Sequence, residues 1–115
     1  MPINGDLLLL LKSNMLGEGE PDLGEKLLKS FLEQLFESES LPIRIICMNS
    51  GIFLSTSGSP VEEILMKFQA AGSQIYSCST CLNYYNRADK LIVGEASNMK
   101  ETVAAMLKFS KILAP

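Results

Sequence analysis

Two of the chain's three cysteines stand close together in the segment YSCSTCLNYYN, residues 76–86, as Cys78 and Cys81. The C-x-x-C spacing is typical of redox pairs, of metal sites and of nucleophilic thiols that carry a group. A structural zinc ion typically takes four Cys or His ligands, and the chain contains no His, so we expect no metal site and no cofactor. The lack of His also excludes a Cys-His catalytic pair. A redox pair, two core-filling cysteines and a nucleophilic carrier thiol stay open.

The rest of the composition narrows the class of protein. The 115 residues suit one domain with a core of its own. The net charge of −3, with Lys and Arg dispersed, argues against nucleic acid as a partner. The leucines at 7–11 are too few to cross a bilayer and follow no basic segment, so neither a membrane segment nor a signal peptide is expected. An odd number of cysteines argues against a disulfide framework, and these points together predict a cytoplasmic protein.

Strands and helices are predicted to alternate along the chain. The expected strands, read from continuous apolar runs, are residues 6–12, 43–48, 74–77, 90–94 and 111–114. Longer helices are expected to begin at Asp22, Ser59 and Asn98, each with a glutamate three residues on, as in a capping box. A short helix is expected over residues 80–86, and residues 52–58 are ambiguous between a short strand and a packed loop.

Apolar residues recur at helical spacing on the first and last of these helices. On the first helix they are Leu23, Leu27, Leu28, Phe31, Leu32, Leu35 and Phe36. On the last helix they are Val103, Met106 and Leu107. Cys47 falls within the second predicted strand and is assigned to the core.

Alternating strands and helices predict an α/β fold with a parallel sheet, of the flavodoxin-like or doubly wound class, in one domain over residues 1–115. In such sheets ligands bind beyond the carboxyl ends of the strands. The candidate ligand-binding residues near these ends are Asn14, Asn49, Ser50, Gly51, Thr80 and Tyr85. Cys78 lies where the third strand meets a helix N-terminus, whose unpaired N–H groups favour a thiolate. Cys81 lies one helical turn further on, within disulfide reach.

Four segments of the chain, in this order, resemble the DsrE/DsrF-like family. They are GEGEPDLGEKLLKSFL at 17–32, MNSGIFLSTSGSPVEE at 48–63, CSTCLNYY at 78–85 and VGEASNM at 93–99. Within the family the chain is most similar to the C-terminal domain of YedF-like proteins, which are linked to sulfur and selenium metabolism. The resemblance implies a three-layer α/β/α fold with a five-stranded parallel sheet. It also implies homo-oligomers and, in several members, a cysteine that carries persulfide sulfur.

The resemblance matches the persulfide cysteine of the family to Cys78, and the chain departs from the family in two places. Ser79 follows Cys78 where the family has Gly, which alters only the local backbone. YedF-like proteins also carry a SirA-like domain with a C-P-x-P cysteine, which the sequence lacks, so an internal sulfur relay is not expected.

Two function classes follow. The first is a sulfur or selenium carrier of sulfurtransferase type, in which Cys78 holds a persulfide, Cys81 is its partner and the donor is a cysteine desulfurase or a SirA-like sulfur carrier. The second is a non-catalytic small-ligand or protein-binding module whose cysteines serve packing or thiol redox sensing. A homo-oligomer with the cysteine site near a subunit boundary is expected. The apolar residues 52–54 are interpreted either as part of that boundary or as buried under the chain's own loops.

Overall fold

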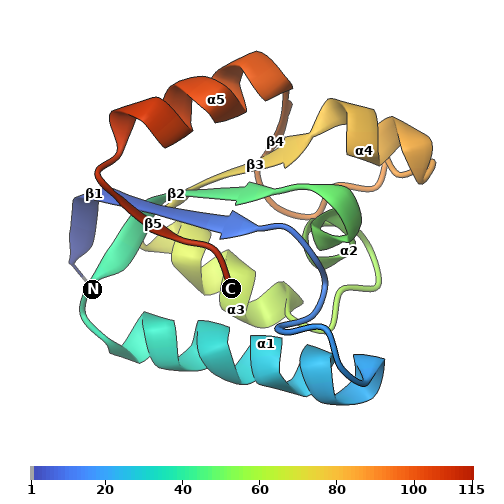
Figure 1. Cartoon of the computed structure of the whole chain (residues 1–115), viewed down its shortest axis with the longest axis horizontal. Coiled ribbons are helices and arrows are strands. Elements are labelled where there is room, and N and C mark those ends of the chain that lie inside the picture. The colour runs from blue at the N-terminus through green and yellow to red at the C-terminus, as the bar shows by residue number, and fades with distance from the viewer. Residues whose placement is uncertain (1) are drawn as a thin grey trace.

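The computed structural model describes residues 2–115 and contains one five-stranded sheet in which every neighbouring pair of strands is parallel (Figure 1). In their order across the sheet the strands are β4 (Glu95–Ser97), β3 (Gln74–Cys78), β2 (Leu41–Cys47), β1 (Ile3–Leu11) and β5 (Lys111–Leu113). The prediction of an α/β fold with a five-stranded parallel sheet is confirmed.

Three longer helices cover the two faces of the sheet. α1 (Pro21–Glu37) and α3 (Glu62–Ala70) lie on one face, and α5 (Met99–Lys108) lies on the other (Figure 1). The steps from β1 to β2 and from β2 to β3 run in the same direction, so right-handed crossovers place α1 and α3 on one side. The return from β4 to β5 runs the other way and takes α5 across the opposite face.

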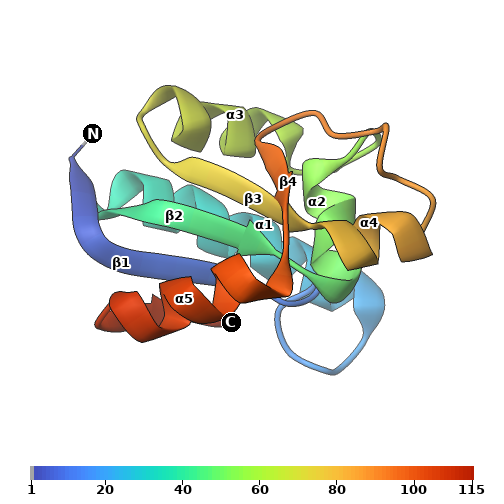
Figure 2. The ribbon, with the colours of Figure 1, turned by 90° about the horizontal axis from the view of Figure 1, so that it is seen from above.

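Three short helical segments lie beyond the carboxyl ends of β2 and β3. They are the 3-10 turn η1 (Asn49–Gly51), α2 (Ile52–Ser55) and α4 (Ser79–Tyr84) (Figure 2). η1 begins two residues after the end of β2, and α2 follows η1 directly. α4 follows β3 directly. The chain therefore turns sharply at this edge of the sheet. Both cysteines of the C-x-x-C segment lie here.

The central strand β1 is buried on both faces, as its unbroken leucine run predicts. Leu9 and Leu11 belong to the larger hydrophobic core beneath α1 and α3. Leu8 and Leu10 belong to a smaller core that α5 covers, together with Phe109. The two faces of the sheet are therefore covered unequally.

The fourth strand is Glu95–Ser97 and not the predicted residues 90–94. Gly94 turns the chain with a φ of +68°, and its N–H donates to the side-chain oxygen of Gln69 at 2.7 Å. Val93, just before that turn, is buried in the larger core, and Leu91 forms an isolated antiparallel bridge with Thr56. The apolar run at this place fills the core and does not form a ladder with β3.

At one of the three predicted helix starts, the predicted N-cap hydrogen bond is present. The side-chain oxygen of Asn98 accepts the N–H of Glu101 at 2.9 Å at the start of α5. The box predicted at Asp22 is wrong, because α1 begins one residue earlier, at a proline whose fixed φ suits a first helical position, and its N-cap makes no side-chain bond. The box predicted at Ser59 is also wrong, because α3 begins later and the Ser59 hydroxyl accepts the N–H of Val61.

The apolar residues that the sequence places on α5 face outward and not toward the sheet. Val103 and Met106 are 46% and 44% exposed, and Leu107 is 83% exposed. The residues of α5 that are buried are Thr102 and Ala105. The three apolar residues noted on this helix in the sequence therefore lie on its outer side.

On α1 the predicted stripe is divided between core and surface. Leu28 and Leu32 are buried against the sheet, whereas Leu23 and Leu27 are exposed. The stripe spans too wide an arc of the helix for one neighbouring layer to cover it.

The ambiguous residues 52–58 begin with the short helix α2. Ile52 and Leu54 are buried in the larger core, and Phe53 packs on Tyr85. Burial under the chain's own residues is therefore the correct interpretation of this apolar segment.

Candidate functional site

The two cysteines lie at the junction of β3 and α4. Cys78 is the last residue of the strand and the N-cap residue of the helix, and it is 4% exposed. Cys81 lies in the first turn of α4 and is partly exposed. The buried thiol is thus next to the strand, and the more exposed thiol is next to solvent.

A pocket of about 490 Å³ opens beside α4 and has Cys81 in its wall. Its lining residues are Met48, Asn49, Thr80, Cys81, Tyr84, Tyr85 and Met99. None of these carries a formal charge at neutral pH, and most present apolar surface. Cys78 is not among them, so a molecule in this pocket meets Cys81 first.

A backbone N–H group is directed at the sulfur of Cys81. The N–H of Asn49 donates to the Cys81 Sγ atom at 3.0 Å. Asn49 follows the end of β2 and has a φ of +53°, the left-handed conformation that Asn tolerates better than most residues. This backbone conformation lets an N–H group just after β2 donate to the Cys81 thiol on α4, the helix that follows β3.

Burial raises the pKa of the Cys81 thiol above its ordinary value; the hydrogen bond from Asn49 lowers it in part, and the neighbouring Cys78 raises it further. The effect of Cys78 on this pKa indicates that the two thiols are close enough to interact.

Aromatic side chains hold α4 against α2 at the side of the pocket. The rings of Tyr85 and Phe53 meet edge to face with centroids 4.7 Å apart, and Tyr84 meets Tyr85 in the same way at 5.1 Å. The guanidinium of Arg87 lies 4.6 Å from the centroid of Phe53 and donates to the hydroxyl of Thr56 at 3.1 Å. These contacts fix the orientation of Tyr85, and the ring of Tyr84 is left 80% exposed at the pocket rim.

The predicted ligand-binding residues separate into two groups. Asn49, Thr80 and Tyr85 come together with Cys81 around the pocket. Asn14 and Ser50 do not line this pocket, and their hydrogen bonds connect neighbouring loops to each other. The Asn14 N–H donates to the Ser50 hydroxyl at 3.3 Å, and the Asn14 side chain donates to Glu25 at 3.5 Å.

Gly51 is buried, and a methyl group added to it would overlap the carbonyl oxygen of Leu11. Its role is therefore the close approach of two chain segments. It does not face the pocket that contains Cys81.

Two pocket residues were not predicted from the sequence. Met48 follows the last residue of β2, and Met99 is the first residue of α5. Met48 could have been found from its position just after a strand. Met99 could not, because its place depends on where the short strand β4 joins the sheet.

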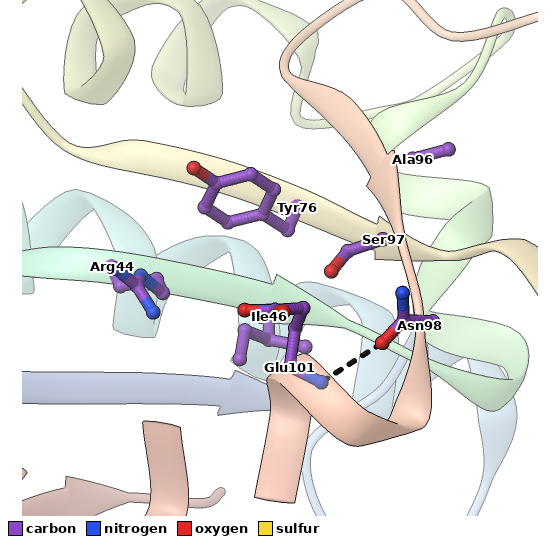
Figure 3. Close-up of a pocket in the computed structure, with 7 residues that line it drawn as sticks. All are labelled: Arg44, Ile46, Tyr76, Ala96, Ser97, Asn98 and Glu101. Atoms are coloured by element: carbon purple, nitrogen blue, oxygen red, sulfur yellow. Dashed lines mark hydrogen bonds between the residues drawn. The ribbon is translucent and has the colours of Figure 1, made fainter. Parts of the chain in front are cut away.

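A second pocket, of about 280 Å³, lies on the α5 face of the sheet (Figure 3). Figure 3 shows Arg44 and Tyr76 toward one end and Ser97 toward the other, with the Glu101 side chain between them. Ser97 is paired with Cys78 across β3 and β4, so this pocket ends beside the buried cysteine.

The guanidinium of Arg44 is held in place on several sides. It lies 5.5 Å from the ring centroid of Tyr76 and 5.3 Å from that of Phe109. Its Nε and Nη2 atoms both donate to the side-chain oxygen of Gln74, at 3.3 Å and 3.2 Å. Because that partner is a neutral amide, these bonds orient the cation without neutralising its charge.

Within residues 2–115, no three or more Cys, Asp or Glu side chains are grouped as metal ligands would be. In the same part of the chain, no helix has the length and apolar character needed to cross a bilayer.

Several solved structures share this fold. The ychN protein from E. coli is 18% identical, with a TM-score of 0.68 over 97% of this chain and 100% of its own. A protein of unknown function, MTH1491 from Methanobacterium thermoautotrophicum, is 13% identical, with a TM-score of 0.71 and the same coverage of both chains. BT1422 from Bacteroides thetaiotaomicron, a conserved protein of unknown function, is 19% identical, with a TM-score of 0.64 over 96% of this chain and 95% of its own.

No protein-family model matches the sequence, and no curated protein does. At these identities the likeness to the solved structures is one of fold. That shared fold agrees with the five-stranded α/β fold that the resemblance implies.

Proposed function

We propose that this chain is a sulfur carrier that holds sulfane sulfur as a persulfide at the Cys78–Cys81 pair. The observation that carries the proposal is the Cys81 thiol in the wall of an open pocket, with the Asn49 N–H donated to its sulfur and a second thiol beside it. The family resemblance, with its persulfide cysteine in this segment, supports the same chemistry. Selenium, which is chemically close to sulfur, is an alternative cargo.

Exposure favours Cys81 as the thiol that meets the donor. The thiolate of Cys81 attacks the outer sulfur of a donor persulfide, the donor's sulfur–sulfur bond breaks, and the donor thiolate leaves. The product is a persulfide on Cys81, next to the Asn49 N–H. Cys78, assigned as the carrier by the resemblance, can then receive the outer sulfur by the same exchange.

The apolar lining of the pocket favours a protein donor over a small anionic one. No Lys or Arg lines it, so an inorganic anion such as thiosulfate would find no cation there. The exposed Tyr84 and the half-exposed Met99 at its rim offer apolar contact to a protein surface. A cysteine desulfurase or a SirA-like carrier, each with a persulfide on a cysteine, fits this description.

Intact mass measurement tests the proposal directly. The reduced protein is incubated with a cysteine desulfurase and cysteine, then separated and weighed. A gain of one sulfur atom, removed by a reductant, is expected. Cys81→Ser should lose most of the gain, whereas Cys47→Ala should keep it, because Cys47 is fully buried. A wild-type protein that gains no sulfur from any persulfide donor contradicts the proposal.

A second candidate function is a small-ligand-binding module, and the pocket around Arg44 favours it. The cation of Arg44 and the carboxylate of Glu101 line the same small space with polar side chains between them (Figure 3). A small zwitterion, such as a free amino acid, has the matching pair of charges. Calorimetric titration with glycine and alanine should then detect binding that Arg44→Gln abolishes. No heat with any amino acid would remove this candidate.

A further inference from the structure

Cys78 and Cys81 have the arrangement of a thiol pair in which one member can act on the other. They are three residues apart at the start of α4, and side chains at this helical spacing are neighbours. Cys78 raises the pKa of the Cys81 thiol, which requires the two sulfurs to be near each other. Cys81 lines the pocket, and Cys78 is buried and does not line it.

We propose that the pair cleaves the persulfide it receives and releases hydrosulfide, with Cys78 as the resolving thiol. This activity rests on the proposed function, since it needs a persulfide on Cys81. The Cys78 thiolate attacks the inner sulfur, which is the Sγ atom of Cys81. The bond between that atom and the outer sulfur breaks, and the outer sulfur leaves as hydrosulfide. The residues are left as a Cys78–Cys81 disulfide.

The step balances without any group beyond those named. The Cys78 thiol loses its proton to solvent, and the sulfane sulfur gains two electrons as hydrosulfide. The two cysteine sulfurs lose those electrons together on forming the disulfide. Two equivalents of a low-molecular-weight thiol then reduce the disulfide and become a disulfide themselves. Over one cycle, a donor persulfide and two thiols give the donor thiol, hydrosulfide and one small disulfide.

The difference in burial between the two cysteines determines on which side the leaving sulfur departs. Displacement at sulfur requires the attacking thiolate, the central sulfur and the leaving sulfur to be nearly in line. Cys81 lines the open pocket, whereas Cys78 is buried and does not line it, so the outer sulfur of a Cys81 persulfide has room on the pocket side. The leaving hydrosulfide therefore has an open path to solvent.

The lining of the pocket favours release over storage. A persulfide anion is held best by a nearby cation, and the lining residues supply none. The hydrogen bond that reaches this place, from the Asn49 N–H, is directed at the Cys81 Sγ atom, which is the sulfur retained in the disulfide. Cys47 does not compete as a resolving thiol, because it is fully buried within β2.

The test uses the full chain under anaerobic conditions. The reduced protein is charged by a cysteine desulfurase and cysteine, freed from donor and small thiols, and followed by hydrosulfide assay and intact mass. We expect hydrosulfide to appear while the persulfide mass is replaced by that of the 78–81 disulfide, which peptide mapping identifies. Added dithiothreitol should then permit repeated cycles. Cys78→Ser should retain the persulfide, and its rate of hydrosulfide release should be about a tenth of the wild-type rate or lower.

Cys78→Ala serves as a second variant in case the serine is poorly accommodated at this buried position, and Cys47→Ala is the matched control that should behave as wild type. A wild-type persulfide that persists with no 78–81 disulfide overturns this inference and leaves the carrier function standing. Equal hydrosulfide release by wild type and both Cys78 variants does the same. Failure of the wild type to take up any sulfur overturns both.

Discussion

Cys47, at the end of β2, and Cys81, in the helix after β3, are the same side chain in two environments. Cys47 is fully buried, and desolvation raises the pKa of its thiol to about 12, although the hydroxyls of Ser55 and Ser77 each lower it in part. These two hydroxyls also bond each other at 2.6 Å. Cys81 is partly exposed and has an N–H donated to its sulfur. Position relative to the core, and not residue type, separates an inert thiol from one available for exchange.

The buried Cys47 thiol should make the folded state less stable in alkali. Below pH 9.0, the ordinary value, the thiol is protonated in both states and its contribution is fully present. Above that pH the unfolded chain ionises and the folded one does not, so the free energy of unfolding falls until the folded pKa of about 12 is reached. The slope from this group approaches about 1.4 kcal/mol per pH unit. Urea unfolding from about pH 8 to about pH 10.5 measures it.

The matched variant is Cys47→Ala, which loses the thiol and should lose this slope. Its stability will be lower at neutral pH because a cavity is left, so the comparison is between slopes and not between absolute values. Parallel pH dependences for wild type and variant would show that Cys47 ionises equally in both states.

Alkylation kinetics report the effect of Cys78 on Cys81. With limiting iodoacetamide and peptide mapping, Cys81 should label before Cys78 because it lines the pocket, and its rate should rise with pH to a midpoint above the ordinary Cys range. Because Cys78 raises the pKa of Cys81, Cys78→Ala should move that midpoint to lower pH. The sequence predicts Cys78 as the more nucleophilic thiol, and faster labelling of Cys78 would support that assignment. An unmoved midpoint in the variant would mean that the two thiols do not interact.

Among the elements, the turn after β2 determines the geometry of the site. It contains Asn49, whose N–H reaches Cys81, and Gly51, which packs on the carbonyl of Leu11 at the end of β1. Gly51 has a φ of −61°, which any residue can adopt, so only the close approach demands glycine. The turn after β2 therefore contacts the end of β1 through Gly51 and the helix after β3 through Asn49.

Gly51→Ala should destabilise the fold by about 2 kcal/mol, because the added methyl group meets backbone that cannot move freely. It should also raise the pKa of Cys81 further, since displacing the turn weakens the Asn49 hydrogen bond that lowers it. Gly19→Ala is the control, because a methyl group there has open space. Urea unfolding and alkylation kinetics test the two effects. A Gly51→Ala protein as stable as Gly19→Ala would show that the turn adjusts easily.

Most of the strands could be predicted from the sequence, but the fourth could not. The parallel strands were predictable because runs such as Leu7–Leu11 are buried on both faces, and parallel strands bring their carboxyl ends to one edge. The same reasoning predicts that Cys81, Asn49 and Tyr85 lie near one edge of the sheet, and in the structure they line one pocket. It failed at β4, since an apolar run ending at Val93 has the same composition whether it pairs with a neighbouring strand or fills the core. The position of Met99, which depends on where β4 joins the sheet, could not be predicted for the same reason.

At the scale of the whole molecule, the two faces of the sheet differ in what they leave exposed. On the α5 face, Met99, Val103 and Met106 follow one another at helical spacing along the outer side of the helix, each at least 44% exposed. Met99 also lines the pocket that contains Cys81, and Tyr84 stands exposed at the rim of the same pocket. An apolar surface therefore runs from the cysteine site along α5. We propose that this surface is the contact between subunits in the homo-oligomer that the family resemblance implies.

A pair of matched methionines tests this contact. Met106 on α5 and Met66 on α3 are both 44% exposed but lie on opposite faces of the molecule. Light scattering at micromolar concentration should find a multiple of the 12.6 kDa chain mass for wild type and for Met66→Asp. Met106→Asp should shift the population toward the monomer, because burying an unpaired carboxylate in an apolar contact costs several kcal/mol. A monomeric wild type ends the proposal. Dissociation by Met66→Asp and not by Met106→Asp would move the contact to the α3 face, away from the cysteines.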